Sequence, residues 1–155
     1  AAALILASLS RRSPGNAGPV LAPFQAPSIV DRSDLATAAV GSLAGRWVVL
    51  IFSSDVCDSC AEVVSKARPL ESDAVAVLDV SFQRHRAMHE KYSIDAVPLT
   101  LIVDPAGAVV KDFSGPVSAT HLWAAVAEAR EPGSTPEGCG EHLSARHIVS
   151  NAEKA

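Results

Sequence analysis

The feature that most constrains the fold is the unbroken apolar run from Trp47 to Phe52. A strand with one solvated face alternates apolar and polar residues, whereas this run holds no polar residue, so we expect a strand that is buried on both faces. A sheet that is covered on both faces needs helices on both sides. The run therefore predicts an α/β fold with this strand at the centre of the sheet.

Other segments predict the rest of the sheet and its helices. Further strands are expected at residues 74–80, 99–103 and 108–113. Helices are expected at residues 61–68, 83–92 and 118–130, the second of them on the surface because it is rich in His and Arg. This order gives a parallel strand pair joined by a helical crossover, followed by an antiparallel hairpin in the same sheet. The predicted architecture is a central mixed β-sheet flanked by helices.

The chain has 155 residues, which is enough for one domain, and we place that domain at residues 35–130. Residues 13–34, rich in Pro and Gly, are expected to form an extended linker, and residues 131–155 a flexible C-terminal tail. Residues 1–12 hold a short apolar run that ends in two arginines, which predicts the end of a cropped membrane anchor. The alternative for this run is a frayed terminus or a short helix.

Composition narrows the classes of function. The formal net charge is −4 and no stripe of Lys and Arg is present, which argues against a nucleic-acid-binding protein. The three cysteines are Cys57, Cys60 and Cys139, and an odd number does not suit a scaffold held together by disulfides. One functional pair fits this count better, with Cys139 as a spare thiol.

Cys57 and Cys60 form a C-x-x-C motif where the predicted central strand ends and a helix begins. The N–H groups at a helix N-terminus are unpaired, so they favour a thiolate at the first cysteine. As a thiolate, Cys57 attacks a disulfide, and Cys60, one helical turn along, attacks the resulting mixed disulfide and releases the product. The spacing therefore predicts a redox-active pair.

Other interpretations of the cysteine pair stay open at this point. A structural, inert pair is one alternative. Half of a zinc site is another, and the candidates for its further ligands are Cys139, His142 and His147. His85 and His89 have the spacing of a chelating pair on one helical face, but the charged residues around them favour a solvated face instead.

The motif is followed by a Val97–Pro98 step, a hairpin and a final helix, and over residues 43–130 this order resembles the thioredoxin-like superfamily. The Pro-rich lead-in and residues 41–50 are similar to the TlpA/ResA-like, membrane-tethered thiol-disulfide oxidoreductases and to the MauD-like proteins. The resemblance implies a thioredoxin-like fold in which Pro98 is cis and lies against the active-site disulfide. It also implies that Val97 and Pro98 line a groove whose backbone pairs with an extended substrate segment.

The sequence departs from this family around the motif. Thioredoxins usually carry Trp before the first cysteine and Gly-Pro between the two, where this chain has Val56 and Asp58–Ser59. They also carry a buried acid on the preceding strand, where this chain has Ile51. This chain therefore has no carboxylate at that position of the strand that could act as a general base for Cys60.

Asp55 and Asp58 flank the predicted nucleophile. Their negative charges oppose thiolate formation, so we expect them to raise the pKa of Cys57 against the effect of the helix N-terminus. A less stable thiolate makes the disulfide harder to reduce, and we expect a reduction potential of roughly −200 to −270 mV. The chain should then resemble thioredoxin or glutaredoxin more than a strong oxidant.

These residues predict a thiol-disulfide oxidoreductase that acts on protein disulfides or dithiols, needs no bound cofactor and is recycled by a separate redox partner. The rival hypothesis is a non-catalytic binding module of the same fold, which holds a partner or delivers a metal such as copper. For localisation, the positive-inside rule applied to Arg11 and Arg12 places the domain on the cytoplasmic face. The family resemblance implies the opposite side, and we expect a membrane-tethered, extracytoplasmic domain, with the cytoplasmic face as the alternative.

Overall fold

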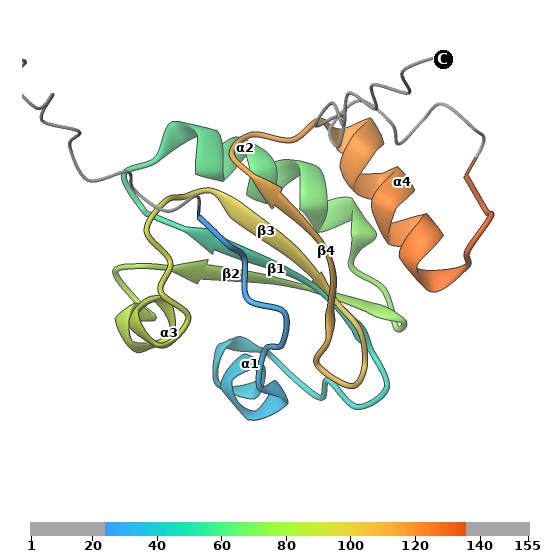
Figure 1. Ribbon diagram of the computed structural model, residues 1–155, viewed down its shortest axis with the longest axis horizontal. Coiled ribbons are helices and arrows are strands. Elements are labelled where there is room, and N and C mark those ends of the chain that lie inside the picture. Colours follow the sequence, from blue (N-terminus) through green and yellow to red (C-terminus); the bar gives the residue numbers. More distant parts are fainter. Residues whose placement is uncertain (1–23, 136–155) are drawn as a thin grey trace, which may run out of the picture.

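The computed structural model describes residues 24–135, which form one mixed four-stranded sheet with helices on both faces (Figure 1). The strands are β1 (Trp47–Ser53), β2 (Val75–Ser81), β3 (Leu99–Val103) and β4 (Val109–Ser114), in the order β2-β1-β3-β4. β1 is parallel to β2 and antiparallel to β3, and β3 is antiparallel to β4. The predicted parallel pair with an added hairpin is confirmed.

The helices are α1 (Arg32–Ala38), α2 (Asp58–Ala67), α3 (Arg86–Lys91) and α4 (Ala119–Arg130), with a 3₁₀ turn, η1 (Arg68–Leu70), after α2. Figure 1 shows α2 and α4 on one face of the sheet and α1 and α3 on the other. α2 begins three residues before the predicted start at Ala61, because Cys57 caps its first turn. Pro69 ends the α-helix as predicted, but the chain continues for one 3₁₀ turn.

β1 supplies both cores of the domain through the alternation of its side chains. Val48, Leu50 and Phe52 belong to the core under α1 and α3, and Val49 and Ile51 to the core under α2 and α4. All five side chains are at most 1% exposed. The central strand is therefore buried on both faces, as its apolar run predicts. We call the two sides of the sheet the α1/α3 face and the α2/α4 face.

The segment predicted as a surface helix over residues 83–92 forms a shorter helix, which is partly buried. α3 is short, and His89 is 3% exposed, with its ring packed edge-on against Phe52. Its Nε2 lies 2.8 Å from the carbonyl oxygen of Val80. The prediction of a solvated pair is therefore wrong for His89, though His85 is only half-buried. The cause is the loop after β2, which folds this side of α3 onto the sheet.

The packed part of the chain begins before residue 35, within the segment expected to be a linker (13–34). Val30 is 1% exposed in the core of the α1/α3 face, and Ile29 pairs with Ala108 beside the hairpin. Asp31 caps the first turn of α1. The Pro-rich composition does not predict that this short segment packs on the domain, because Val30 contacts residues that are distant in the sequence.

Polar contacts fasten α1 to the rest of the α1/α3 face. The Tyr92 hydroxyl donates to Asp34 at 2.6 Å and accepts from the Asp31 N–H at 2.9 Å, and Lys91 donates to Asp34 at 2.6 Å. The hydrogen bonds from Lys91 and Tyr92 lower the pKa of Asp34, and burial raises the pKa of Tyr92. The Arg32 guanidinium donates to the carbonyl oxygens of Leu43, Arg46 and Asp104.

β2 is an edge strand of the sheet, and two side chains bond its outward-facing backbone. Glu71 Oε2 accepts a hydrogen bond from the Val77 N–H at 2.7 Å. The Arg46 guanidinium donates to the Val75 carbonyl oxygen at 2.7 Å and pairs with Glu71 at 2.5 Å. Side chains of the chain itself thus occupy part of this edge.

Among the helices within residues 24–135, none is long and apolar enough to cross a membrane. The anchor expected at residues 1–12 lies outside the described residues, as does most of the tail expected at residues 131–155. The three candidate zinc ligands in that tail also lie outside them, namely Cys139, His142 and His147.

Candidate active site

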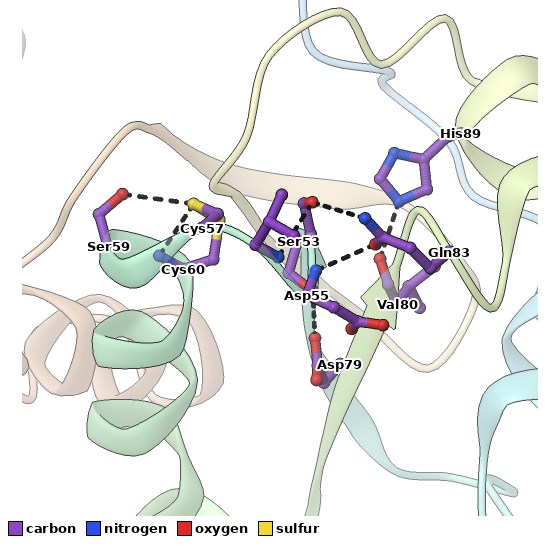
Figure 2. Close-up of a disulfide and its surroundings, with 11 residues drawn as sticks. Ser53, Asp55, Cys57, Ser59, Cys60, Asp79, Val80, Gln83 and His89 are labelled. Carbon is purple, nitrogen blue, oxygen red and sulfur yellow. Dashed lines mark hydrogen bonds between the residues drawn. A yellow bond between two sulfur atoms is a disulfide. The ribbon is translucent and has the colours of Figure 1, made fainter.

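The cysteine pair lies where the sequence predicts it, at the junction of β1 and α2, and it forms a disulfide (Figure 2). Cys57 is the N-cap of α2, and the Cys60 N–H donates to the Cys57 Sγ at 3.2 Å. The Ser59 hydroxyl lies 3.4 Å from the same sulfur. Once the disulfide is reduced, this N–H and the helix N-terminus favour negative charge on the Cys57 Sγ.

The two cysteines differ in exposure. Cys60 is 1% exposed, whereas Cys57 is half-buried. Val56, directly before Cys57 in the chain, is an apolar residue that is 87% exposed. Cys57 is therefore the sulfur that is more accessible to an external disulfide, and Cys60 is shielded from one. This geometry fits the order of attack predicted from the spacing.

The loop that leads into Cys57 is held by the loop after β2. The Asp55 N–H donates to Gln83 Oε1 at 3.0 Å, and Gln83 Nε2 donates to the Ser54 hydroxyl at 3.0 Å. Figure 2 shows the Gln83 side chain directed at the Asp55 backbone. The sequence does not predict this role of Gln83. A polar residue in a segment that favours a helix gives no indication that it contacts a distant loop.

The two acids that flank Cys57 have different surroundings. The Asp55 side chain is 48% exposed and lies 3.6 Å from Arg84, which also bonds Asp79 at 3.1 Å. Asp58 is exposed in the first turn of α2, where a negative charge interacts favourably with the helix N-terminus. Arg84 thus offsets part of the charge of Asp55, which the sequence does not reveal. The effect of both acids on the Cys57 thiol stays a prediction.

A pocket of about 310 Å³ lies beside the disulfide and α2, lined by both cysteines together with Asp55, Arg68 and Asp79. Asp79 is the register partner of Ile51 on the neighbouring strand. The Ser53 hydroxyl donates a hydrogen bond to Asp79, as Figure 2 shows. The sequence holds one signal for this residue, since Asp79 is the one polar residue in the apolar run 74–80. Its proximity to the cysteines depends on strand register, which the sequence does not give.

The Val97–Pro98 peptide bond is cis, as the family resemblance implies. Pro98 is buried directly before β3, and Val97 is half-buried. The Pro98 carbonyl oxygen accepts a hydrogen bond from the Gly115 N–H at 2.8 Å, so that acceptor is already engaged. The role of Val97 and Pro98 in a substrate groove stays a prediction.

In the part of the chain that the structure describes, no group of three or more His, Cys, Asp and Glu side chains is placed to hold a metal ion. His89 Nε2 lies against the Val80 carbonyl oxygen instead of facing a shared ligand site with His85. The zinc interpretation depends on residues of the tail that lie outside the described range.

Neither a protein-family model nor a curated protein matches the chain. Solved structures do: a mutant thioredoxin from Halobacterium salinarum aligns with a TM-score of 0.51 and 18% identity, over 62% of this chain and 80% of its own. Fasciola hepatica thioredoxin aligns with a TM-score of 0.48 and 25% identity, over 55% of this chain and 82% of its own. StoA from Bacillus subtilis aligns with a TM-score of 0.42 and 18% identity, over 51% of this chain and 81% of its own.

The likeness to the Halobacterium salinarum thioredoxin extends over most of the described residues. It agrees with the mixed four-stranded sheet and with the helices on both of its faces. The architecture that the sequence predicts is thereby confirmed, and the chain has a thioredoxin-like fold.

Proposed function

We propose that the chain is a thiol-disulfide oxidoreductase that reduces or exchanges disulfides in protein substrates, with no bound cofactor. The observation that carries the proposal is a half-buried Cys57 at the N-terminus of α2, paired with a Cys60 that is 1% exposed. This arrangement separates an attacking thiol from a resolving thiol. The thioredoxin-like fold supports the same assignment.

The reaction consists of two exchange steps. The Cys57 thiolate attacks one sulfur of the substrate disulfide, so that a bond from Cys57 to the substrate forms and the other substrate sulfur leaves as a thiolate. Cys60, as a thiolate, then attacks the Cys57 Sγ, the Cys57–Cys60 bond forms, and the second substrate sulfur leaves. The substrate gains two electrons and two protons. An external dithiol, supplied by a redox partner, must reduce the pair before the next cycle.

We place the substrate segment across Val56 and the Val97–Pro98 step. The exposed Val56 and the half-buried Val97 support this placement, because both offer apolar surface to a polypeptide. Val97→Asp should therefore raise the KM for a protein disulfide and leave the rate with a small aromatic disulfide within about twofold. Equal losses with both substrates would contradict this placement.

A redox titration of the purified chain tests the proposal, in glutathione or dithiothreitol buffers with alkylation and mass mapping of the thiols at each potential. We expect one two-electron transition between roughly −200 and −270 mV, in which Cys57 and Cys60 are protected together. Cys139 should stay open to alkylation. Capture of either motif cysteine by Cys139, or no joint protection, would contradict the proposal.

Turnover separates an oxidoreductase from a binding module or a copper-delivery protein. The chain should accelerate the reduction of insulin by dithiothreitol, and the acceleration should vanish in Cys57→Ser. A chain that binds insulin or copper but adds nothing to this rate would favour the rival hypothesis.

We also propose that the domain is tethered to a membrane on its extracytoplasmic side through the segment that includes residues 1–12. The apolar run before Arg11 and Arg12 supports the tether, and the resemblance to the TlpA/ResA-like proteins supports the extracytoplasmic side. A membrane-impermeant maleimide, added to reduced intact cells, should then label Cys57 in the membrane fraction. Labelling only after lysis would place the domain on the cytoplasmic face.

A further inference from the structure

We propose that Asp79 accepts the proton of Cys60 when that thiol attacks the mixed disulfide. This role rests on the proposed function and lies outside the C-x-x-C motif. Cys60 is 1% exposed, so its thiol cannot pass a proton directly to bulk water. A thiol must lose that proton before it becomes an effective nucleophile. The resolving step therefore needs an acceptor inside the protein.

The pocket beside α2 offers a route for the proton. It has a volume of about 310 Å³, and Cys60 and Asp79 both line it. One water molecule takes up about 30 Å³ in the liquid, so the pocket has room for water between the thiol and the carboxylate. Ser53 lines the same pocket and provides a further polar partner for such water.

The fold places the Asp79 carboxylate on the side of the sheet where Cys60 lies. Asp79 is opposite Ile51 in the register of β1 and β2, and both Ile51 and Val77 pack in the core of the α2/α4 face. The Ser53 hydroxyl donates to Asp79 Oδ1, and Arg84 donates to Oδ2 at 3.1 Å. An acid in an apolar strand is unfavourable unless it is hydrogen-bonded, and these two donors hold it in place.

The other acids near the motif are less suited to this role. Asp55 also lines the pocket, but its side chain is 48% exposed and lies in the outer loop before Cys57. Asp58 is exposed on the first turn of α2 and does not line the pocket. Asp79 is the carboxylate that combines a place in the pocket with two hydrogen-bond donors, and its side chain is 28% exposed.

In the resolving step, the S–H bond of Cys60 breaks and its proton passes through water in the pocket to Asp79. The Cys60 thiolate attacks the Cys57 Sγ, the Cys57–Cys60 bond forms, and the bond from Cys57 to the substrate sulfur breaks. The electron pair of that bond leaves with the substrate sulfur, which takes a proton from solvent. Asp79 then releases its proton to solvent, and the path runs in reverse when a dithiol reduces the pair.

Stopped-flow absorbance can follow both thiols of the reduced chain, in a Cys139→Ser background that removes the third thiol. The probe is the aromatic disulfide dithionitrobenzoate. Attack by Cys57 releases a first thionitrobenzoate at a rate proportional to the probe concentration. Attack by Cys60 on the mixed disulfide releases a second one at a rate independent of the probe concentration. The two phases report the nucleophile and the resolving thiol separately.

In Asp79→Asn we expect the second phase to slow about 10- to 100-fold at pH 7, while the first phase changes less than about twofold. Above about pH 9.5, hydroxide deprotonates a thiol without an internal acceptor, so the rates of the variant and the parent should converge. A structural defect would slow the second phase at every pH. Asp79→Glu should recover part of the lost rate.

Asp73→Asn is the matched control, since Asp73 is an exposed acid just before β2 that does not line the pocket. Both of its phases should equal those of the parent. An unchanged or faster second phase in Asp79→Asn would overturn the proposal, and so would a larger loss in Asp55→Asn.

If Asp79→Asn does not fold, Ser53→Ala carries the test. It removes the hydroxyl that holds the Asp79 carboxylate, so the second phase should slow and recover at high pH, and no loss would overturn the proposal. Absence of a second phase in the parent protein would instead refute the proposed function itself.

Discussion

The α1/α3 face and the α2/α4 face share β1 but differ in what surrounds it. On the α1/α3 face, the core is closed by two helices and by polar contacts of Arg32 and Tyr92. On the α2/α4 face, the core ends in a pocket beside an acid and a disulfide. The sheet thus keeps the contacts that stabilise α1 apart from the disulfide and the pocket beside it. Substitutions on the two faces should therefore affect different measurements.

The largest effect on a measured rate is expected for Cys57→Ser, at the disulfide beside the α2/α4 face. A serine hydroxyl is not an effective nucleophile at neutral pH without an adjacent base, so disulfide exchange should fall by about 10³-fold or more in the insulin assay. The free energy of unfolding of the reduced chain should change by less than about 1 kcal/mol. Cys139→Ser is the matched control and should keep full activity.

The next largest effect is expected from two N-terminal truncations. We propose that the linker ends at residue 25, before the half-buried Ala26 that packs against the core, so removal of residues 1–25 should change the free energy of unfolding by less than about 0.5 kcal/mol. Removal of residues 1–34 also deletes the buried Val30, the Asp31 cap and Arg32, and should cost at least about 3 kcal/mol in urea unfolding. The reduction potential of a folded variant should not move. Equal stabilities would show that residues 26–34 are linker after all.

A smaller effect is expected for Tyr92→Phe. The lost hydroxyl should lower the free energy of unfolding by about 1 kcal/mol at pH 7 and leave the reduction potential unchanged. Hydrogen bonds from Lys91 and Tyr92 hold the pKa of Asp34 below its ordinary value of 3.8. A lowered folded-state pKa gives stability that is present above the unfolded pKa and is lost as the pH falls through the folded pKa.

The acid unfolding of this variant gives a second measurement. Because one hydrogen bond to Asp34 is gone, stability should fall less steeply below the ordinary carboxyl pKa in Tyr92→Phe than in the parent. Identical slopes in acid, measured by urea unfolding at several pH values, would mean that Lys91 alone sets the pKa of Asp34.

The smallest effect is expected for Gln83→Ala, which frees the loop before Cys57. Stability should fall by about 0.5 kcal/mol, because the two lost hydrogen bonds lie at the surface. The first phase with dithionitrobenzoate should change about twofold, and Tyr92→Phe should leave that phase unaltered. A change of the same size in both variants would remove the distinction between the two faces.

The features that the sequence predicts are those set by local pattern. The apolar run of β1, the hairpin of β3 and β4, and the final helix α4 all appear as expected. The position of Cys57 at a helix start follows from the strand before it and the motif itself. The cis peptide bond at Pro98 is expected from the family resemblance and not from the local sequence pattern.

The features that the sequence does not predict depend on contacts between distant segments. Asp79 lies beside the cysteines only because β1 and β2 pair in one particular register. His89 is buried although its neighbours are charged, because the loop before α3 turns that helix onto the sheet. Val30 packs on the core from a Pro-rich segment. Composition and periodicity report none of these long-range placements.

The side chains along the edge of β2 have a consequence for assembly. A bare edge strand is a template on which another chain can add a strand and extend the sheet. Here Glu71 occupies the Val77 N–H, and Arg46 occupies the Val75 carbonyl oxygen. These two bonds leave fewer backbone groups at this edge on which the growth of a sheet between chains can start.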